Sequence, residues 1–305
     1  MSVRVEIRQR LDDPEIAEVL GLVEAATEAD GVRPLNEHVM LHLRYGGDPR
    51  ARSLLLYQDD VLAGYAHVDP TDEVEGPSAE LVIHPARRRA GNGAHLLRAV
   101  LDRAGGRLRL WAHGDHAAAG ALAAAFGMER VRSLWQMRRS LFAPLAPYAL
   151  PEGVRLRTFV PGQDEESWLK VNAAAFAHHP EQGAWTMDDL LRREQEGWFD
   201  PEGFFLAFRG DRLAGFHWTK IHGASDRDED HGHEPLGEVY VVGVDPSQQG
   251  TGLGKALTLA GLHHLRARGL AQAMLYVDEA NTAAIRLYES LGFARWDVDV
   301  MYAAT

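Results

Sequence analysis

The chain has no cysteine among its 305 residues, and it has no long apolar run. Without cysteine there is no disulfide framework, no cysteine nucleophile and no thiolate metal site. The longest apolar run, Ala117 to Met128, is too short to span a bilayer. The N-terminal sequence MSVRVEIRQRLDDPE is charged throughout and lacks the apolar segment of a signal peptide. We therefore expect a cytoplasmic protein that does not act at a membrane.

Basic residues are also relatively few. Lysine and arginine number 32 against 44 aspartates and glutamates, which gives a formal net charge of −12. Nucleic-acid binding needs a net basic surface, so we expect no nucleic-acid partner. An acidic balance suits a ligand with a cationic group, although it more often serves only solubility. The hydrophobic fraction of 46% is that of an ordinary globular protein, and the length favours two domains.

What the sequence does contain is an internal repeat. The strand-like LVIHP and the following ARRRAGNGAHLLRAV (residues 81–100) are matched by VVGVDP and SQQGTGLGKALTLAG (residues 241–261). Further on, ALAAAFGMERV (121–131) parallels IRLYESLGFARW (285–296). Between the halves lies the proline-rich segment LFAPLAPYALPEG, which is typical of a semi-rigid linker. We predict domains at residues 1–140 and 153–305, joined by a linker at 141–152.

The second half shows the clearer order of elements. Strands are expected at 154–159, in a hairpin over 203–221 that turns at Gly210–Asp211, and at 237–244, 273–277 and 294–303. Helices are expected at 164–177, 186–197, 254–269 and 281–292, and the polar segment 226–235 is expected to be a loop. This mixture predicts the α/β class, with a mostly antiparallel sheet and helices on both faces.

Three glycines, Gly250, Gly252 and Gly254, separate the strand at 237–244 from the following helix. Backbone N–H groups at a helix N-terminus are unpaired, and glycines let a phosphate approach them, so the loop is a candidate pyrophosphate cradle. A tight strand–helix turn is the alternative, and the more common one for a lone glycine pattern. A P-loop is excluded because Ala256 follows Lys255, and a dinucleotide-binding fold would place its loop after the first strand. Gly243 indicates a bulge or a close approach by a ligand within the preceding strand.

The pattern Arg/Gln-x-x-Gly-x-Gly/Ala between a strand and a helix resembles the acyl-CoA motif of the GNAT superfamily of N-acetyltransferases. Residues 249–254 (QGTGLG) fit this motif, and so do residues 88–93 (RRAGNG). The segment NTAAIRLYESLGF (281–293) is similar to the Asn…Tyr…Gly-Phe helix of the same superfamily. The resemblance implies two tandem GNAT domains, each a mixed, mostly antiparallel sheet flanked by helices, with acetyl-CoA as co-substrate and no metal.

Over its whole length the chain is similar to the mycothiol synthase family of tandem acetyltransferases. In the first half the resemblance rests on DGVRPLNE (30–37), AELVIHP (79–85), WAHGD (111–115) and QMRR (136–139). In the second half it rests on NAAAFAHHPEQGAWT (172–186), WFDPEGFFLAF (198–208), GFHWTKIH (215–222) and LGEVYVVGVDP (236–246). The family acetylates the cysteinyl amine of a cysteine–glucosamine–inositol pseudodisaccharide. A small thiol–sugar substrate is therefore implied, and we expect a monomer.

The resemblance also implies which residues hold acetyl-CoA. In the first half they are Leu81, Val82, Ile83, Arg89, Ala90, Gly91, Asn92, Gly93 and Ala94. In the second half they are Val242, Gly243, Val244, Gln249, Gly250, Thr251, Gly252, Leu253, Gly254, Lys255, Asn281, Thr282, Ala283, Ala284, Ile285 and Arg286. The substrate would be bound by Glu37, Glu181, Lys220, Glu238 and Tyr276, so that its pocket would touch both domains. Taken singly, each of these could be a solvated surface residue.

Two residues are expected to carry the chemistry. An α-ammonium must lose a proton before it attacks a thioester, and because such amines titrate at about 8, a weak base suffices. Glu238 is the expected base, acting directly or through water, and an exposed strand-end carboxylate is the alternative. The resemblance implies Tyr288 as the acid that protonates the departing thiolate. It shares a helical stripe with Asn281 and Ile285, and a half-buried core tyrosine is the alternative.

The first half departs from the catalytic pattern, because Ala123 stands at the position of Tyr288 and His116 at that of Asn281. We expect it to bind acetyl-CoA without catalysing, to shape the pocket and to contribute Glu37. Two histidine-containing segments, HHPE (178–181) and HGH (231–233), do not complete a metal-ligand set. Two rival functions remain: a tandem GNAT enzyme that acetylates another amine, of aminoglycoside or aminoacyl type, and a non-catalytic acetyl-CoA sensor. The second rival predicts the loss of Glu238 or Tyr288, and both are present.

Overall fold

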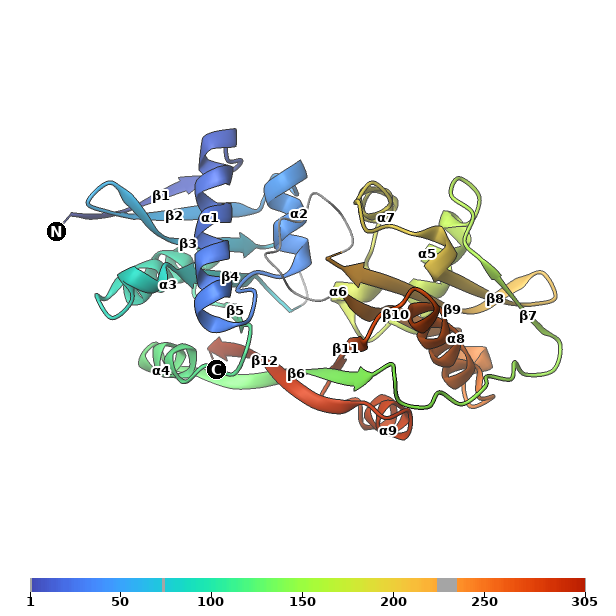
Figure 1. Ribbon diagram of the computed structural model, residues 1–305. Helices are drawn as coiled ribbons and strands as arrows, with labels where there is room; N and C mark the ends of the chain where they lie inside the picture. Colours follow the sequence, from blue (N-terminus) through green and yellow to red (C-terminus); the bar gives the residue numbers. More distant parts are fainter. Residues whose placement is uncertain (1, 73–74, 224–234, 305) are drawn as a thin grey trace. The chain divides into compact units, whose positions relative to one another are not determined.

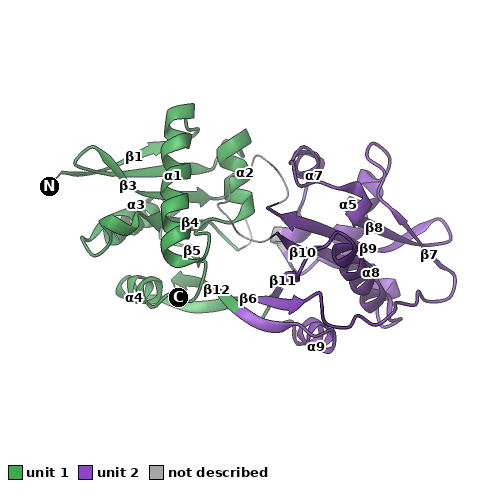
Figure 2. Ribbon diagram, viewed as in Figure 1, with its two compact units in different colours: residues 1–135, 278–280, 297–305 green, residues 136–277, 281–296 purple. Residues whose placement is uncertain are grey.

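The computed structural model describes residues 2–72, 75–223 and 235–304, without the side chains of residues 180 and 181 (Figure 1). The chain forms two compact units (Figure 2). Unit 1 comprises residues 1–135, 278–280 and 297–305, and unit 2 comprises residues 136–277 and 281–296. Unit 1 therefore takes its last strand from the end of the second repeat. The repeats expected from the sequence and the compact units of the structure are different divisions of the chain.

The sheet of unit 1 runs in the order β1-β2-β3-β4-β5-β12. Neighbouring strands are antiparallel except for β4 and β5, which are parallel. The strands are β1 (Val3–Arg8), β2 (Arg52–Gln58), β3 (Val61–Asp69), β4 (Ser78–Ile83), β5 (Arg109–Ala112) and β12 (Ala294–Ala304). A further strand, β6 (Met128–Ser140), passes from unit 1 into unit 2 after residue 135.

Helices cover both faces of this sheet. Along β2, Leu54 and Leu56 pack in one core with Leu96 and Leu97 of α3, whereas Leu55 packs in a second core with residues of α1 and α2. This division follows from the period-2 alternation of a strand that is buried on both faces. The helices are α1 (Asp13–Asp30), α2 (Glu37–Tyr45), α3 (Asn92–Ala104) and α4 (Ala117–Ala125), with the 3₁₀ turn η1 (Pro85–Arg87) before α3.

The sheet of unit 2 includes the order β11-β10-β9-β8-β7. Here β10 and β11 are parallel, and the other pairs are antiparallel. The strands are β7 (Val154–Thr158), β8 (Phe204–Arg209), β9 (Arg212–His222), β10 (Leu236–Val244) and β11 (Gln272–Asp278). The helices are α5 (Glu165–Ala175), α6 (Pro180–Gly183), α7 (Met187–Glu194), α8 (Leu253–Ala267) and α9 (Thr282–Ser290), and the 3₁₀ turns are η2 (Pro201–Gly203) and η3 (Pro246–Gln248).

Alternation again separates two cores. On one face of β9, Phe216 and Trp218 pack with Trp168 of α5 and Leu190 of α7. On the other face, the buried His217 hydrogen-bonds the carbonyl of Leu257 in α8 through Nδ1, at 2.7 Å. Glu238 of β10 lies opposite Lys220 of β9, two residues beyond Trp218 and on the same face, so the aromatic face leads to the site described below.

The strands and helices expected in the second half are confirmed, as is the α/β class with mixed, mostly antiparallel sheets. The expected loop at 226–235 falls almost wholly outside the described residues. The linker expected at 141–152 packs along α8 in unit 2. His263 contacts the carbonyl oxygen of Ala146 at 2.9 Å, and Arg266 donates to the carbonyl oxygen of Leu141 at 2.7 Å.

Candidate active site

Strands β10 and β11 separate soon after they meet. Within the described residues they pair only at Gly237–Ala273 and Glu238–Met274, although both strands continue. From Val239 onward, the edge of β10 that faces β11 lies outside the parallel ladder, while its other edge stays paired with β9. Such an edge offers N–H and C=O groups to an extended amide chain. The candidate acyl-CoA residues Val242, Gly243 and Val244 lie on this part of β10.

The glycine loop leads from β10 into α8. Gly250 and Gly252 have φ of 76° and 84°, and Gly252 is the N-cap of α8. A Cβ added to either glycine would meet no atom within 4 Å, so backbone conformation and open space, rather than crowding, account for them. The unpaired N–H groups of the first turn of α8 face this space, which suits a pyrophosphate. Lys255 lies exposed in that first turn.

The first repeat keeps the shape of this loop. Gly91, with φ of 83°, is the N-cap of α3, and Arg89 adopts φ of 62° at the position of Gly250. A left-handed conformation at an arginine is unusual and indicates a loop fixed by its surroundings. Arg88 contributes to this by forming two hydrogen bonds of 2.7 Å with the Asp30 carboxylate of α1. Asn92 is buried and donates to Gln58 and to the carbonyl of Arg87.

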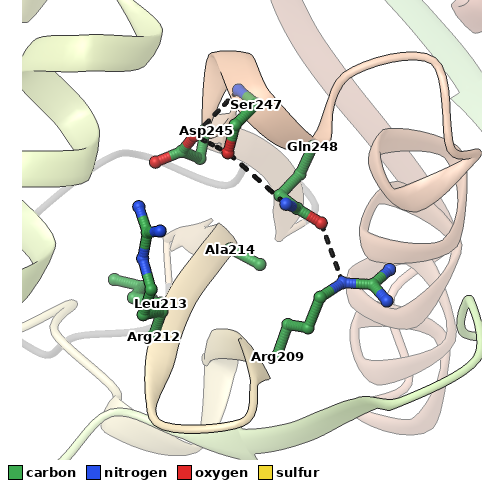
Figure 3. Close-up of a pocket in the computed structure, with 7 residues that line it drawn as sticks. All are labelled: Arg209, Arg212, Leu213, Ala214, Asp245, Ser247 and Gln248. Atoms are coloured by element: carbon green, nitrogen blue, oxygen red, sulfur yellow. Dashed lines mark hydrogen bonds between the residues drawn. The ribbon is translucent and has the colours of Figure 1, made fainter.

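A small pocket lies beside η3 and the β8–β9 hairpin (Figure 3). Its polar side chains bond one another: Asp245 accepts from the hydroxyl of Ser247 at 2.6 Å, and Gln248 accepts from Arg209 Nε at 2.8 Å. These bonds fix the turn that precedes the glycine loop. We assign the pocket a structural role in holding that turn.

Strand β10 contains the expected bulge, but at Tyr240, three residues before Gly243, the residue from which it was predicted. The β9–β10 register shifts between Val239 and Val241, which makes Tyr240 the extra residue, whereas Gly243 pairs regularly with Phe216. A Cβ at Gly243 would lie 2.7 Å from the Phe216 ring, so packing of that ring requires glycine here. The bulge turns Tyr240 toward the aromatic face, where its ring centroid is 5.3 Å from that of Trp218.

Glu238 lies where β10 and β11 part, and only 7% of it is exposed. Its Oε2 accepts a hydrogen bond from Nε2 of His222 at 2.8 Å. On the neighbouring strand, Lys220 is its direct cross-strand partner. The Lys220 ammonium also lies 4.2 Å from the ring centroid of Trp198 and 5.4 Å from that of Tyr240. A carboxylate, an imidazole and an ammonium therefore share the end of the aromatic face.

Tyr276 lies two residues after Met274 on β11, so it is on the same face of the sheet as Glu238. It is 40% exposed, and its hydroxyl accepts a hydrogen bond from Gln136 Nε2 at 2.9 Å. The structure thus brings Lys220, Glu238 and Tyr276 to one face of unit 2. Glu37 is the first residue of α2 in unit 1 and is half-buried. Glu181 belongs to α6, but its side chain is outside the described part of the chain.

Tyr288 is a buried residue of α9. Burial raises the pKa of its hydroxyl to about 12, so the group stays protonated at neutral pH. Its ring meets that of Phe293 edge-on at 5.9 Å, and within the described residues its hydroxyl has no hydrogen-bond partner. The helical stripe is partly as expected: Ile285 is buried with Tyr288, while Asn281 is exposed and caps α9 by accepting from the Ala284 N–H at 3.1 Å. The other candidate residues of this helix, Thr282, Ala283, Ala284 and Arg286, form its first turns.

Unit 1 also has a buried carboxylate, Glu80, at the end of its parallel ladder, which was not predicted from the sequence. Glu80 is the last residue of β4 that pairs with β5, and its partner on β3 is His67. Glu238 has the same two relationships, to Met274 and to Lys220. The two residues are not equivalent by alignment, because the glycine loops and the pairings of β3 with β4 and of β9 with β10 all set Glu80 opposite Val241, three residues beyond Glu238.

Two further residues of the unit 2 site were missed. His222 follows Lys220 at the two-residue spacing of one strand face, which could have indicated it. Arg193 is a buried residue of α7 whose Nε donates to the Tyr240 hydroxyl at 2.8 Å and whose guanidinium lies 3.8 Å from the ring centroid of Trp185. Its burial could not be read from the sequence, where it is one of a pair of adjacent arginines.

The described residues contain no group of three or more His, Asp or Glu side chains placed to hold a metal ion. No helix among them combines the length and apolar character needed to cross a membrane.

Comparison with known proteins identifies the family. The sequence model of the Acetyltransferase (GNAT) family matches residues 21–128 and 168–293. A mycothiol acetyltransferase of Streptosporangium roseum is 66% identical, and one of Thermobispora bispora is 65% identical, each over 99% of both chains.

Solved structures agree on the fold. A tandem GNAT protein from the clavulanic acid biosynthesis pathway aligns with a TM-score of 0.73 at 19% identity, covering 100% of this chain and 99% of that one. A GCN5-related N-acetyltransferase from Sphaerobacter thermophilus aligns with a TM-score of 0.68 at 25% identity, covering 98% and 95%. The chain therefore belongs to the GNAT family of acetyltransferases and, within it, to the mycothiol acetyltransferases.

Proposed function

We propose that the protein transfers the acetyl group of acetyl-CoA to the cysteinyl amine of a cysteine–glucosamine–inositol pseudodisaccharide, giving mycothiol and CoA. The observation that carries this proposal is the arrangement in unit 2. A buried carboxylate lies where β10 and β11 part, upstream of a glycine loop that caps α8. The relatives named above are mycothiol acetyltransferases along their whole length, which supports this choice of amine.

The residues around the glycine loop fit acetyl-CoA, which supplies the activated acetyl group as a thioester. The left-handed Gly250 and Gly252 leave open space before the N–H groups of α8, where a pyrophosphate would be held. The edge of Val242–Val244 outside the parallel ladder would hydrogen-bond the amide groups of the pantetheine arm. Lys255 would add a positive charge near the phosphates.

Glu238 would accept the proton that the cysteinyl ammonium loses before its nitrogen bonds to the acetyl carbon. Its burial and its hydrogen bond to His222 hold the carboxylate in one orientation. The partly exposed His222 offers that proton a route to solvent. Lys220, Tyr276, Glu37 and Glu181 would bind the sugar hydroxyls and the amide of the substrate.

Tyr288 would donate its proton to the CoA sulfur as the carbon–sulfur bond breaks. Its raised pKa keeps the hydroxyl protonated, and the lack of a described partner leaves that proton available. Unit 1 keeps the loop of Gly91 but has Ala123 in place of Tyr288. We propose that it binds acetyl-CoA without turning it over.

The decisive assay offers acetyl-CoA together with the cysteinyl pseudodisaccharide and follows CoA release and the N-acetylated product by mass. Glucosamine–inositol without cysteine is the matched control, and an aminoglycoside tests the rival amine class. We expect rapid turnover only with the cysteinyl substrate. Comparable turnover of the control or of the aminoglycoside would contradict the proposed acceptor while leaving acetyl transfer intact.

A further inference from the structure

Unit 1 contains a buried acid–imidazole–acid cluster, formed by Glu80, His113 and Asp299. His113 Nδ1 donates to Asp299 Oδ2 at 2.9 Å, and its Nε2 lies 3.3 Å from Glu80 Oε1. Glu80 and Asp299 are 3% and 7% exposed, and the side chain of His113 is 11% exposed. The other Asp299 oxygen accepts from the N–H of Gly114 at 2.9 Å.

The cluster lies at the end of the parallel ladder of unit 1. Glu80 is the last residue of β4 that pairs with β5, and its partner there is Trp111. His113 follows two residues after Trp111, and its imidazole reaches the Glu80 carboxylate. In unit 2 the buried Glu238 likewise ends the ladder of β10 with β11.

The two carboxylates favour the protonated form of His113. Burial alone would lower its pKa, but the charge of Glu80 and the hydrogen bond that His113 donates to Asp299 outweigh burial and raise the pKa to about 10. The imidazole thus lies between two buried carboxylates, those of Glu80 and Asp299. Buried charges of this kind add little net stability compared with well-packed apolar residues. The presence of these three buried charged groups therefore favours a role in holding neighbouring backbone and side chains in defined positions.

The second carboxylate oxygen of Glu80 holds the start of helix α2 in place. Oε2 accepts the backbone N–H of Asn36 at 2.7 Å. Asn36 is the N-cap of α2, and its side chain accepts the N–H of Val39 at 2.9 Å. Glu37, a candidate substrate residue, is the first residue of this helix. A continuous set of contacts therefore runs from Asp299 through His113 and Glu80 to the helix start that carries Glu37.

We propose that His113 is a positioning residue for substrate binding, which fixes Glu80 against the Asn36 amide and thereby orients Glu37 at the start of α2. The proposal rests on the substrate-binding role of Glu37 given under the proposed function. It does not make His113 a catalytic residue, since His113 touches neither substrate nor reacting atoms.

The first test measures hydrogen exchange of the full-length protein. His113→Leu removes both contacts of the imidazole and should speed exchange of the Asn36 and Val39 amides by about tenfold or more, with the amides of α8 unchanged. Asp72→Asn is the matched control, because it breaks an ion pair of 2.8 Å with Arg109 in the same unit without touching α2. If His113→Leu does not fold, His113→Gln, which keeps one donor, should show a smaller acceleration of about threefold. If the Asn36 and Val39 amides exchange at the wild-type rate in these variants, the proposal is overturned, whatever the activity measurements show.

The second test is a double-mutant cycle in steady-state kinetics. His113→Gln should raise KM for the cysteinyl substrate by about 5- to 20-fold, with kcat and KM for acetyl-CoA within about twofold of wild type. Combined with Glu37→Gln, it should raise KM no further than Glu37→Gln alone, because both act through one carboxylate. Multiplying effects, or an unchanged KM with faster exchange at α2, would overturn the proposal. If the wild-type enzyme does not acetylate the cysteinyl substrate, the proposed function is contradicted instead. The hydrogen-exchange measurement alone then decides whether His113 fixes the start of α2.

Discussion

His222 donates a hydrogen bond from Nε2 to Oε2 of Glu238 at 2.8 Å, from one strand of the sheet to the next. The carboxylate is 9% exposed at its side chain and the imidazole 34%, so the pair joins a buried group to a partly solvated one. A base in such a pair can pass on the proton it has taken, which a lone buried carboxylate does poorly. This relationship distinguishes Glu238 from the solvated strand-end carboxylate that was the alternative.

Glu238→Gln keeps the shape of the side chain and removes the carboxylate that we propose as the base. We expect kcat to fall by roughly 10²–10⁴, with partial recovery at higher pH, where the amine arrives already neutral. The measurement is the pH profile of kcat for wild type and variant. An unchanged rate and profile would reduce Glu238 to a binding residue.

Tyr288→Phe removes one hydroxyl and keeps the ring beside Phe293. Because the hydroxyl has no described partner, no protein hydrogen bond is lost, and the melting temperature should stay nearly constant. The variant lacks the proposed proton donor for the thiolate, so kcat should fall by about 10–10² with both KM values little changed. Calorimetry and kinetics on one preparation check this. A large drop in melting temperature with kcat retained would make Tyr288 a core residue only.

Gly252→Val and Gly91→Val form a matched pair, since both residues are helix N-caps with φ of 84° and 83°. A branched residue is strained in either conformation, so both variants should lose similar stability. Only Gly252→Val should also raise KM for acetyl-CoA or abolish turnover, because its side chain enters the space before α8. Loss of turnover in folded Gly91→Val, with Gly252→Val active, would mean that unit 1 is the catalytic half.

Because of the His113 cluster, the free energy of unfolding should decrease as the pH rises into the alkaline range. Its pKa is raised from an ordinary 6.5 to about 10 in the folded protein, so folding is favoured by proton binding. The contribution is complete below about pH 6.5 and is lost as pH rises toward about 10. Urea unfolding from pH 6 to 10 should show a decline in wild type that is absent in His113→Gln. Parallel declines in the two proteins would show that another group is responsible.

Local rules account for what the sequence predicted well. The glycine loop, the Asn281 cap, the Gly210–Asp211 turn and the order of strands and helices in the second half depend on neighbouring residues. Backbone conformation at glycine and the exposed N–H groups of a helix start are set within a few residues, so the sequence carries them directly. Repetition of these patterns also determined that two acetyltransferase-like halves exist.

Pairing between strands that are distant in the sequence determined the features that the sequence did not predict. The bulge at Tyr240, rather than at Gly243, follows from how β10 pairs with β9. The contact of His113 with Asp299 joins residues 186 apart because the last strand, β12, pairs with β5 of unit 1. The hydrogen bond of His222 with Glu238 and that of Arg193 with Tyr240 also join residues that are far apart in the sequence, and both depend on the tertiary structure. Contacts across a sheet depend on register and strand order, which no short stretch of sequence encodes, so only the tertiary structure could decide them.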